Sequence, residues 1–192
     1  PSKALITASD LAYEAGHAEE MGVYADPEVD VEQLFAWKDD IVNGMTRSVQ
    51  KLSRANGVDL LEGRAEFVDE RTLAVATDEE DEDPQRLTFE NVILAPGSRP
   101  IEIPGFEFDG EQVLSSREAL SLAELPERVV VVGAGYIGME LSTVLAKLGV
   151  EVTVVEMLDD VMPGYESDLT RPVRRQASEI GIDLHFGEGP HS

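Results

Sequence analysis

The chain has 192 residues, of which 39 are acidic and 15 are basic, so its net charge is −24. So acidic a surface repels nucleic acids and anionic membranes, and we expect neither as a partner. With no Cys, the sequence excludes disulfides and thiol chemistry within these residues. A solvated acidic surface suits high salt, which screens self-repulsion, and a specific cationic partner is the alternative.

The first part of the chain predicts two helices. Ser2–Ala15 has apolar residues at helical spacing and leads to a glycine. After a polar loop, Asp30 can cap a long helix, with Gln33 at the capping-box position and Gly57 as the stop. We expect one apolar face of this helix to pack in a core or on a partner helix. The face consists of Leu34, Ile41, Val42, Met45, Val49 and Leu52.

After Gly57 the apolar residues alternate, which indicates short strands separated by polar turns. The acidic run Asp78–Asp83 between two of these strands predicts an exposed hairpin tip, with a metal site as the remote alternative. The candidate strands are Val58–Leu61, Arg64–Val68, Thr72–Ala76, Arg86–Phe89 and Val92–Leu94.

The turn at Ala95–Pro100 follows an apolar strand and contains only small residues, prolines and one arginine. It is equally consistent with a plain turn and with close backbone approach to a ligand. Prolines and glycines then make the stretch up to Gly110 a stiff linker, and we expect the domain boundary there. Ser116 is expected to cap a short helix through Leu120.

A strand, a glycine turn and a helix follow. The β-branched run Val129–Val132 is typical of a parallel strand buried on both faces. Gly133, Gly135 and Gly138 form GxGxxG, in which the glycines serve the tight turn, the approach of a pyrophosphate and helix packing, respectively. The next helix has an apolar stripe and ends at Gly149. This arrangement predicts a dinucleotide at the helix N-terminus.

The second strand, Glu151–Val155, is followed by Glu156, at roughly the 20-residue spacing where a carboxylate accepts the ribose hydroxyls. Asp159 and Asp160 follow without a nearby Arg or Lys in the sequence. Such an acidic cluster repels a 2′-phosphate, so we expect NAD rather than NADP.

The chain then predicts a helix over Asp168–Ile180, beginning a few residues later if Pro172 marks its first turn, and a strand at Ile182–Phe186. It starts at Pro1 rather than Met, and a doubly wound domain needs more strands than follow Val129. We therefore expect a piece of a longer chain.

Four motifs in order resemble the pyridine nucleotide-disulfide oxidoreductases. They are Pro1–Leu5, Gly63–Phe67, Ala95–Pro100 and Gly133–Leu141. The resemblance covers essentially the whole chain. It implies an α/β fold of two Rossmann-like dinucleotide-binding domains. Residues 1–110 would be a partial FAD-binding domain with a β-meander, and residues 111–192 a partial NAD-binding domain with a parallel sheet.

The resemblance also implies roles for single residues. Lys3 would lie beside the flavin and pair, as a buried ammonium, with Glu140, which would otherwise be an exposed helix residue. Tyr136 would be the aromatic gate over the nicotinamide, and its alternative role is packing at the helix start. The implied NAD contacts are Gly133, Ala134, Gly135, Tyr136, Ile137, Gly138, Glu140 and Glu156. The implied FAD contacts are Lys3, Ala65, Gly97 and Ser98.

The members most similar in these motifs oxidise dihydrolipoyl thiols, passing electrons through a disulfide and FAD to NAD⁺. This implies a lipoyl-bearing subunit of 2-oxoacid dehydrogenase complexes as partner and a homodimer of the full-length protein. No apolar run in the sequence is long enough to span a membrane and no signal peptide is visible, so we expect a cytoplasmic location. The redox cysteine pair would precede Pro1, so the piece alone should be inactive. The alternatives are mercuric reductase, soluble transhydrogenase or a non-catalytic NAD- or FAD-binding scaffold. His17, His185 and His191 are expected to be structural or exposed.

Overall fold

The fold is described from a computed structural model, which covers residues 1–77 and 83–187. The expected hairpin tip at Asp78–Asp83 therefore lies almost wholly outside the described residues. The elements in chain order are α1 (Ser2–Gly16), η1 (Glu19–Met21), α2 (Val31–Ala55), β1 (Arg64–Asp69), β2 (Thr72–Ala76), β3 (Gln85–Thr88), α3 (Ser116–Ala119), β4 (Arg128–Val132), α4 (Tyr136–Lys147), β5 (Glu151–Glu156), α5 (Ser167–Glu179) and β6 (Asp183–Phe186).

Two compact units make up the chain. The first contains Pro1–Asn43 and Pro100–Ser192, and the second is Gly44–Arg99, so the division falls within α2. These units reflect compactness and differ from the expected division at residue 110, which concerns the cofactor that each part binds. The assignment of residues 1–110 to FAD and 111–192 to NAD therefore stays a prediction.

The second unit holds an antiparallel sheet in the order β1-β2-β3, which confirms the expected meander. Phe67 and Phe89 pack edge to face with ring centroids 6.2 Å apart. The strands expected at Val58–Leu61 and Val92–Leu94 were wrong, because both segments lack a paired neighbour in the described structure and run as irregular chain. Apolar alternation favours a strand only where a second strand supplies hydrogen bonds.

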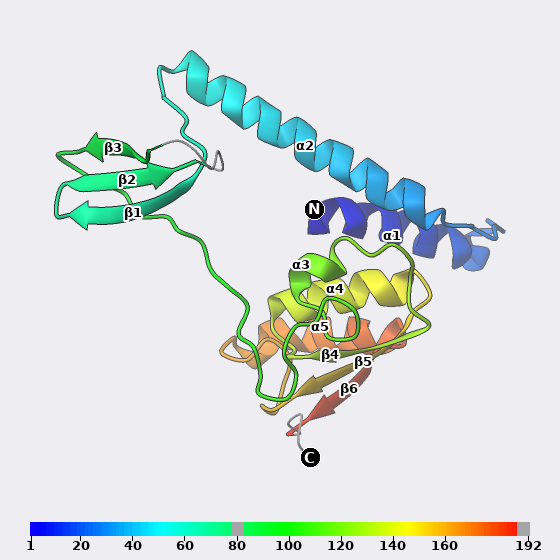
Figure 1. The fold of residues 1–192 in the computed structure, drawn as a ribbon. Helices are drawn as coiled ribbons and strands as arrows, with labels where there is room; N and C mark the ends of the chain where they lie inside the picture. Colours follow the sequence, from blue (N-terminus) through cyan, green and yellow to red (C-terminus); the bar gives the residue numbers. More distant parts are fainter. Residues whose placement is uncertain (78–82, 188–192) are drawn as a thin grey trace. The chain divides into compact units, whose positions relative to one another are not determined.

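A parallel sheet in the order β4-β5-β6 forms the core of the first unit. Figure 1 shows α4 and α5 on this sheet, and residues from both helices join one buried cluster with β5. The expectation that β4 is buried on both faces was wrong. Val130 is 64% exposed and Val132 is exposed as well, because no described element covers the face of the sheet to which these alternate residues belong.

Local signals set the helix ends. Asp30 accepts a hydrogen bond from the Gln33 amide at 2.9 Å, as its capping position predicts. Gly57, with φ of 73°, follows the end of α2. The start of α3 differs from the prediction, because Ser115 rather than Ser116 is the cap, in a capping box with Glu118. The hydroxyl of Ser115 lowers the pKa of the Glu118 carboxyl. Pro172 does not mark the first turn of α5, because the helix begins at Ser167. Pro172 lies inside the helix, where its missing N–H leaves the carbonyl of Asp168 without an intrahelical donor.

The apolar face of α2 is buried at one end only. Leu34 is buried with Leu5 of α1 and Val144 of α4 in a second core cluster. Met45, Val49 and Leu52 are exposed, so the expectation of core packing holds for the first turns of the helix alone.

The acidic surface predicts stability that depends on salt. With a net charge of −24, self-repulsion opposes the compact state, and its range shrinks from about 10 Å at 0.1 M salt to about 3 Å at 1 M. We expect the melting temperature, followed by circular dichroism, to rise by at least about 5 °C between 0.1 and 2 M KCl. Sucrose at matched osmolality is the control for a non-ionic effect. A melting temperature that is flat in KCl would contradict the electrostatic explanation.

Candidate functional site

The glycine turn joins β4 to α4, and each of its three glycines meets a different physical demand. Gly133 has φ of 104°, a conformation that side chains disfavour. Gly135 has ordinary angles, and a Cβ built there meets nothing within 4 Å. At Gly138 a Cβ would lie 2.1 Å from the carbonyl oxygen of Gly133. The turn therefore has one strained position, one position facing open space and one position of close helix packing.

The N-terminus of α4 opens onto the turn. Gly135 is the N-cap residue, and within the described residues no side chain caps this helix and no acid lies in its first turn. The first amides of a helix lack intrahelical partners and carry a partial positive charge. Tyr136 and Ile137 stand exposed beside them. This combination suits an anionic group held by backbone amides.

Glu156 lies at the end of β5 and is only 9% exposed. Its Oε2 accepts a hydrogen bond from the amide of Ala134 at 2.8 Å, and its Oε1 accepts one from the amide of Leu158 at 2.9 Å. Ala134 is fully buried inside the turn. The carboxylate therefore fastens the glycine turn to the end of the neighbouring strand, a role that its spacing in the sequence did not reveal.

Arg174 of α5 lies beside the acidic residues that follow Glu156, and the sequence alone did not reveal this neighbour. Asp160 binds the hydroxyl of Thr170 at 3.0 Å, and its Oδ1 lies 3.7 Å from the Arg174 guanidinium of α5. Arg174 also lies over the ring of Phe186, 4.6 Å from its centroid. One charge of the cluster is thus partly balanced by an arginine that is remote in sequence.

Lys3 and Glu140 form an ion pair between α1 and α4. The side chain of Lys3 is 77% exposed and that of Glu140 is 34% exposed. Burial of the Lys3 ammonium beside a flavin stays a prediction. Exposed pairs of this kind contribute little to stability, about 0–1 kcal/mol. The pair brings the N-terminal helix to the first turns of the helix that follows the glycine turn.

The residues expected at the flavin are divided between the units. Ala65 lies on β1 opposite Val75, and both Gly97, with φ of 76°, and Ser98 are exposed. These three residues belong to the second unit, whereas Lys3 belongs to the first. Their common site stays a prediction.

Two of the three histidines have structural partners. His17 stacks on Tyr13 with centroids 4.0 Å apart and bonds the carbonyl of Tyr13 at 2.8 Å. His185 lies 2.8 Å from Asp183, and His191 is outside the described residues. Over residues 1–77 and 83–187 there is no cluster of metal-binding side chains and no helix long and apolar enough to cross a membrane.

Known proteins resemble this chain over nearly its whole length. It is 59% identical over 187 residues to dihydrolipoyl dehydrogenase of Halobacterium salinarum and 60% identical over 188 residues to dihydrolipoyl dehydrogenase 2 of Haloarcula marismortui. A dihydrolipoyl dehydrogenase of Staphylococcus aureus is 42% identical over 185 residues. These matches cover 97%, 98% and 96% of this chain, but only 40%, 40% and 39% of the relatives. The chain thus spans about 40% of the length of these relatives.

Solved structures share the fold. LpdA from Mycobacterium tuberculosis matches with a TM-score of 0.86 and 26% identity, over 97% of this chain and 41% of that protein. The flavoprotein disulfide reductase RclA from Escherichia coli matches with a TM-score of 0.77 over 98% of this chain and 39% of that protein. At 21% identity this second likeness concerns the fold alone. A family model described as pyridine nucleotide-disulphide oxidoreductase matches residues 1–192. The chain therefore belongs to the pyridine nucleotide-disulphide oxidoreductase family.

Proposed function

We propose that this chain is the part of a dihydrolipoamide dehydrogenase in which NAD is bound and brought to the flavin. The observation that carries the proposal is the Lys3–Glu140 ion pair, which joins the N-terminal helix to the helix of the glycine turn. The identity of 59–60% to dihydrolipoyl dehydrogenases supports it further.

The residues of the turn fit a dinucleotide. Open space at Gly135 lets the pyrophosphate approach the amides at the start of α4. Both oxygens of Glu156 already accept an amide, but each carboxylate oxygen has a second lone pair that a ribose hydroxyl can use. NAD is preferred over NADP, since a 2′-phosphate would meet Glu156 and Asp159. Arg174 weakens this repulsion only in part, because it is shared with Asp160.

On the flavin side, we propose that Lys3 contacts the isoalloxazine and that Ala65, Gly97 and Ser98 contact FAD in the full-length protein. Residues 1–110 and 111–192 would then be parts of two Rossmann-like domains, one for each cofactor. When bound, the flavin and nicotinamide supply the electron transfer. The role of Glu140 is to hold the Lys3 ammonium in place, and that of Tyr136 is to cover the nicotinamide pocket.

The overall reaction would carry electrons from dihydrolipoyl thiols through a disulfide and FAD to NAD⁺. The sequence has no Cys, so this disulfide would have to come from other residues of the full-length protein, and we expect these 192 residues alone to be inactive. The full-length protein would work as a cytoplasmic homodimer beside the lipoyl-bearing subunit of a 2-oxoacid dehydrogenase complex.

One assay tests this function. Full-length protein with bound flavin should reduce NAD⁺ in the presence of dihydrolipoamide, monitored at 340 nm, and should use NADP⁺ poorly. Activity with mercuric ion or between NADPH and NAD⁺, without dihydrolipoamide oxidation, would identify a different member of the family. Bound nucleotide with no turnover of any of these substrates would identify a scaffold protein.

Replacing Lys3 with alanine should slow hydride transfer by about tenfold or more and shift the flavin absorption spectrum, because a positive charge beside the flavin is lost. Stopped-flow absorption of the full-length protein measures both. Lys3→Arg keeps the charge and is the matched control, with an expected smaller effect. A wild-type spectrum and rate in Lys3→Ala would remove Lys3 from the site.

A further inference from the structure

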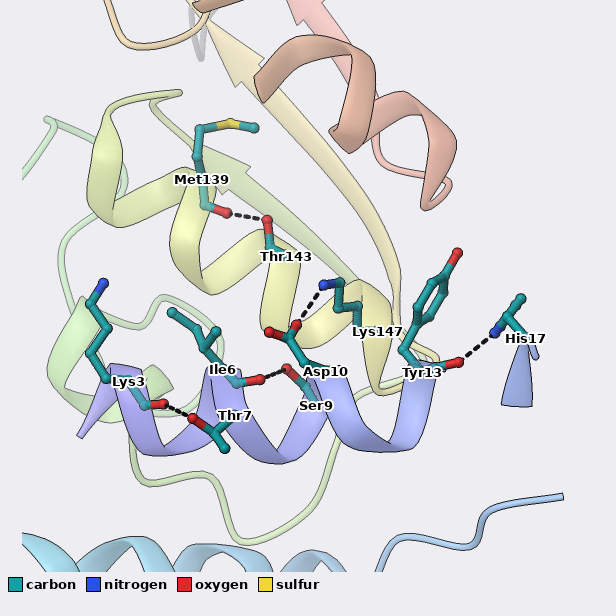
Figure 2. Close-up of polar contacts among 10 residues, drawn as sticks. All are labelled: Lys3, Ile6, Thr7, Ser9, Asp10, Tyr13, His17, Met139, Thr143 and Lys147. Carbon is teal, nitrogen blue, oxygen red and sulfur yellow. Dashed lines mark hydrogen bonds and ion pairs between the residues drawn. The ribbon is translucent and has the colours of Figure 1, made fainter. Parts of the chain in front are cut away.

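Helices α1 and α4 are joined by a second ion pair, which the proposed chemistry does not use. Asp10 of α1 accepts from the Lys147 ammonium of α4 at 2.5 Å. Figure 2 shows the two helices side by side, with Lys147 directed toward Asp10. The Lys3–Glu140 pair lies toward the other end of the same two helices. Two polar links therefore bracket one helix interface.

The two pairs share one register. In each pair the partners are 137 residues apart, so α1 and α4 run in the same direction without a shift between the pairs. The pairs are separated by about two helical turns, roughly 10 Å along the axis. Between them, Leu5 of α1 and Val144 of α4 belong to one buried apolar cluster. Apolar packing supplies the attraction here, but it specifies register weakly.

Each helix contributes a cation to one pair and an anion to the other. Helix α1 contributes a cation at Lys3 and an anion at Asp10, whereas α4 contributes an anion at Glu140 and a cation at Lys147. If α1 slid by the distance between the pairs in either direction, Lys3 would meet Lys147 or Asp10 would meet Glu140. Reversing one helix would create both of these repulsive pairs. The charges therefore favour the observed register and disfavour its nearest alternatives.

The two pairs differ in their exposure to solvent. The Lys147 side chain is 10% exposed and that of Asp10 is 38% exposed, against 77% for Lys3. The Lys147 ammonium also lies 5.7 Å from the centroid of the Tyr13 ring. Salt screens exposed charges far more than partly buried ones. Salt therefore weakens the Asp10–Lys147 pair less than the Lys3–Glu140 pair.

We propose that Asp10 and Lys147 are positioning residues that hold α1 in register on α4 and so keep Lys3 beside Glu140. The inference rests on the proposed function only in the use of the Lys3–Glu140 pair, because the register itself needs no cofactor. Neither Asp10 nor Lys147 touches the reacting groups. Their effect on the reaction passes through the placement of Lys3.

Because the sequence has no Cys, introduced cysteines can report the register directly. In the 192-residue chain, Lys3→Cys and Glu140→Cys would be bridged by dibromobimane, which fluoresces strongly once it joins two thiols. These substitutions remove the first ion pair, so the second alone then fixes the register. Adding Asp10→Lys should slow bridging at least fivefold, and adding Lys147→Asp to it should restore the rate to within about twofold.

The exposed Asp168–Arg171 pair of α5 provides the matched control, and Asp168→Lys should leave bridging unchanged. Asp10→Asn, which adds no repulsion, should slow bridging less than Asp10→Lys, and it serves if the lysine variant loses helical circular dichroism. Bridging that is unchanged in both Asp10 variants would overturn the inference, as would a charge-swapped double variant as slow as the single ones.

Different measurements test the proposed function and the role of the Asp10–Lys147 pair. If full-length protein with wild-type Asp10 and Lys147 does not oxidise dihydrolipoamide, the function is wrong, while the bridging rates still decide the role of the pair. If it is active, Asp10→Lys should slow hydride transfer at least fivefold, with rescue by the added Lys147→Asp. Bridging that changes without a change in hydride transfer would overturn the positioning role.

Discussion

Replacing Glu156 with glutamine should shift nucleotide preference toward NADP⁺ while preserving the fold. Glutamine keeps the size of the side chain and one carbonyl oxygen for the amide of Ala134 or Leu158, and it leaves the other amide without its acceptor, at a cost of about 1–3 kcal/mol. It removes the negative charge that would face a 2′-phosphate. We expect NAD⁺ affinity to fall about tenfold and the ratio of NADP⁺ to NAD⁺ affinity to rise by a similar factor, about 1.4 kcal/mol. Isothermal titration calorimetry with both nucleotides measures the two constants.

Arginine at the same position is a stronger change but a less clean one. Glu156→Arg would place a cation at a nearly buried site and leave two backbone amides without their acceptor. Each lost acceptor costs about 1–3 kcal/mol, so this variant should unfold at a clearly lower temperature. Its nucleotide preference should still move toward NADP⁺ if it folds. An unchanged ratio of affinities in Glu156→Gln would refute the contact of Glu156 with the ribose.

The segment from β4 to β5 could be predicted almost to the residue, because its signals are local. A glycine at positive φ, such as Gly133 or Gly149, marks a turn wherever it stands in the fold. The predicted strand Glu151–Val155 agrees with β5 to within one residue, and α4 ends at Lys147, two residues before the predicted stop at Gly149. Capping and glycine stops depend on a few neighbouring residues, so they survive without knowledge of the tertiary structure.

Strand pairing and burial could not be predicted in the same way, because they depend on distant partners. Val92–Leu94 has the composition of a strand, yet no strand pairs with it in the described structure. The run Val129–Val132 does form a strand, but one face of the sheet is uncovered in the described structure, which leaves Val130 exposed. The composition of a segment indicates whether it can form a strand, whereas the topology of the fold determines which elements cover that strand.

The candidate site likewise has features that the sequence predicts and features that only the tertiary structure shows. The turn and Glu156 were visible as a motif, whereas the bond from the Ala134 amide to Glu156 spans 22 residues and appears only when β5 lies beside β4. Outside this site, nothing in the sequence indicated that Lys38 would be buried. It is buried in α2, and its ammonium binds the carbonyl of Leu120 at 2.8 Å and Asp39 at 2.6 Å. A lysine on a helix is normally solvated, so only the structure identifies such a bond.

Two alanine substitutions in the glycine turn should separate binding from folding. In Gly138→Ala the new methyl would lie 2.1 Å from the carbonyl oxygen of Gly133, so α4 must move away from the turn. We expect a loss of about 3 kcal/mol in the free energy of unfolding and a melting temperature lower by about 6–12 °C. Denaturant unfolding and thermal melts measure these changes.

In Gly135→Ala the methyl meets no atom within 4 Å, and the backbone angles, with φ of −67° and ψ of 175°, suit alanine. Stability should therefore stay within about 0.5 kcal/mol of the original, whereas NAD⁺ affinity should fall at least about tenfold as the methyl occupies the approach of the pyrophosphate. Normal NAD⁺ binding by Gly135→Ala would show that the turn does not hold the pyrophosphate. Equal stability of the two variants would contradict the packing role of Gly138. Opposite effects, with one variant stable but deficient in binding and the other destabilised, would assign the open position to the nucleotide and the crowded one to the fold.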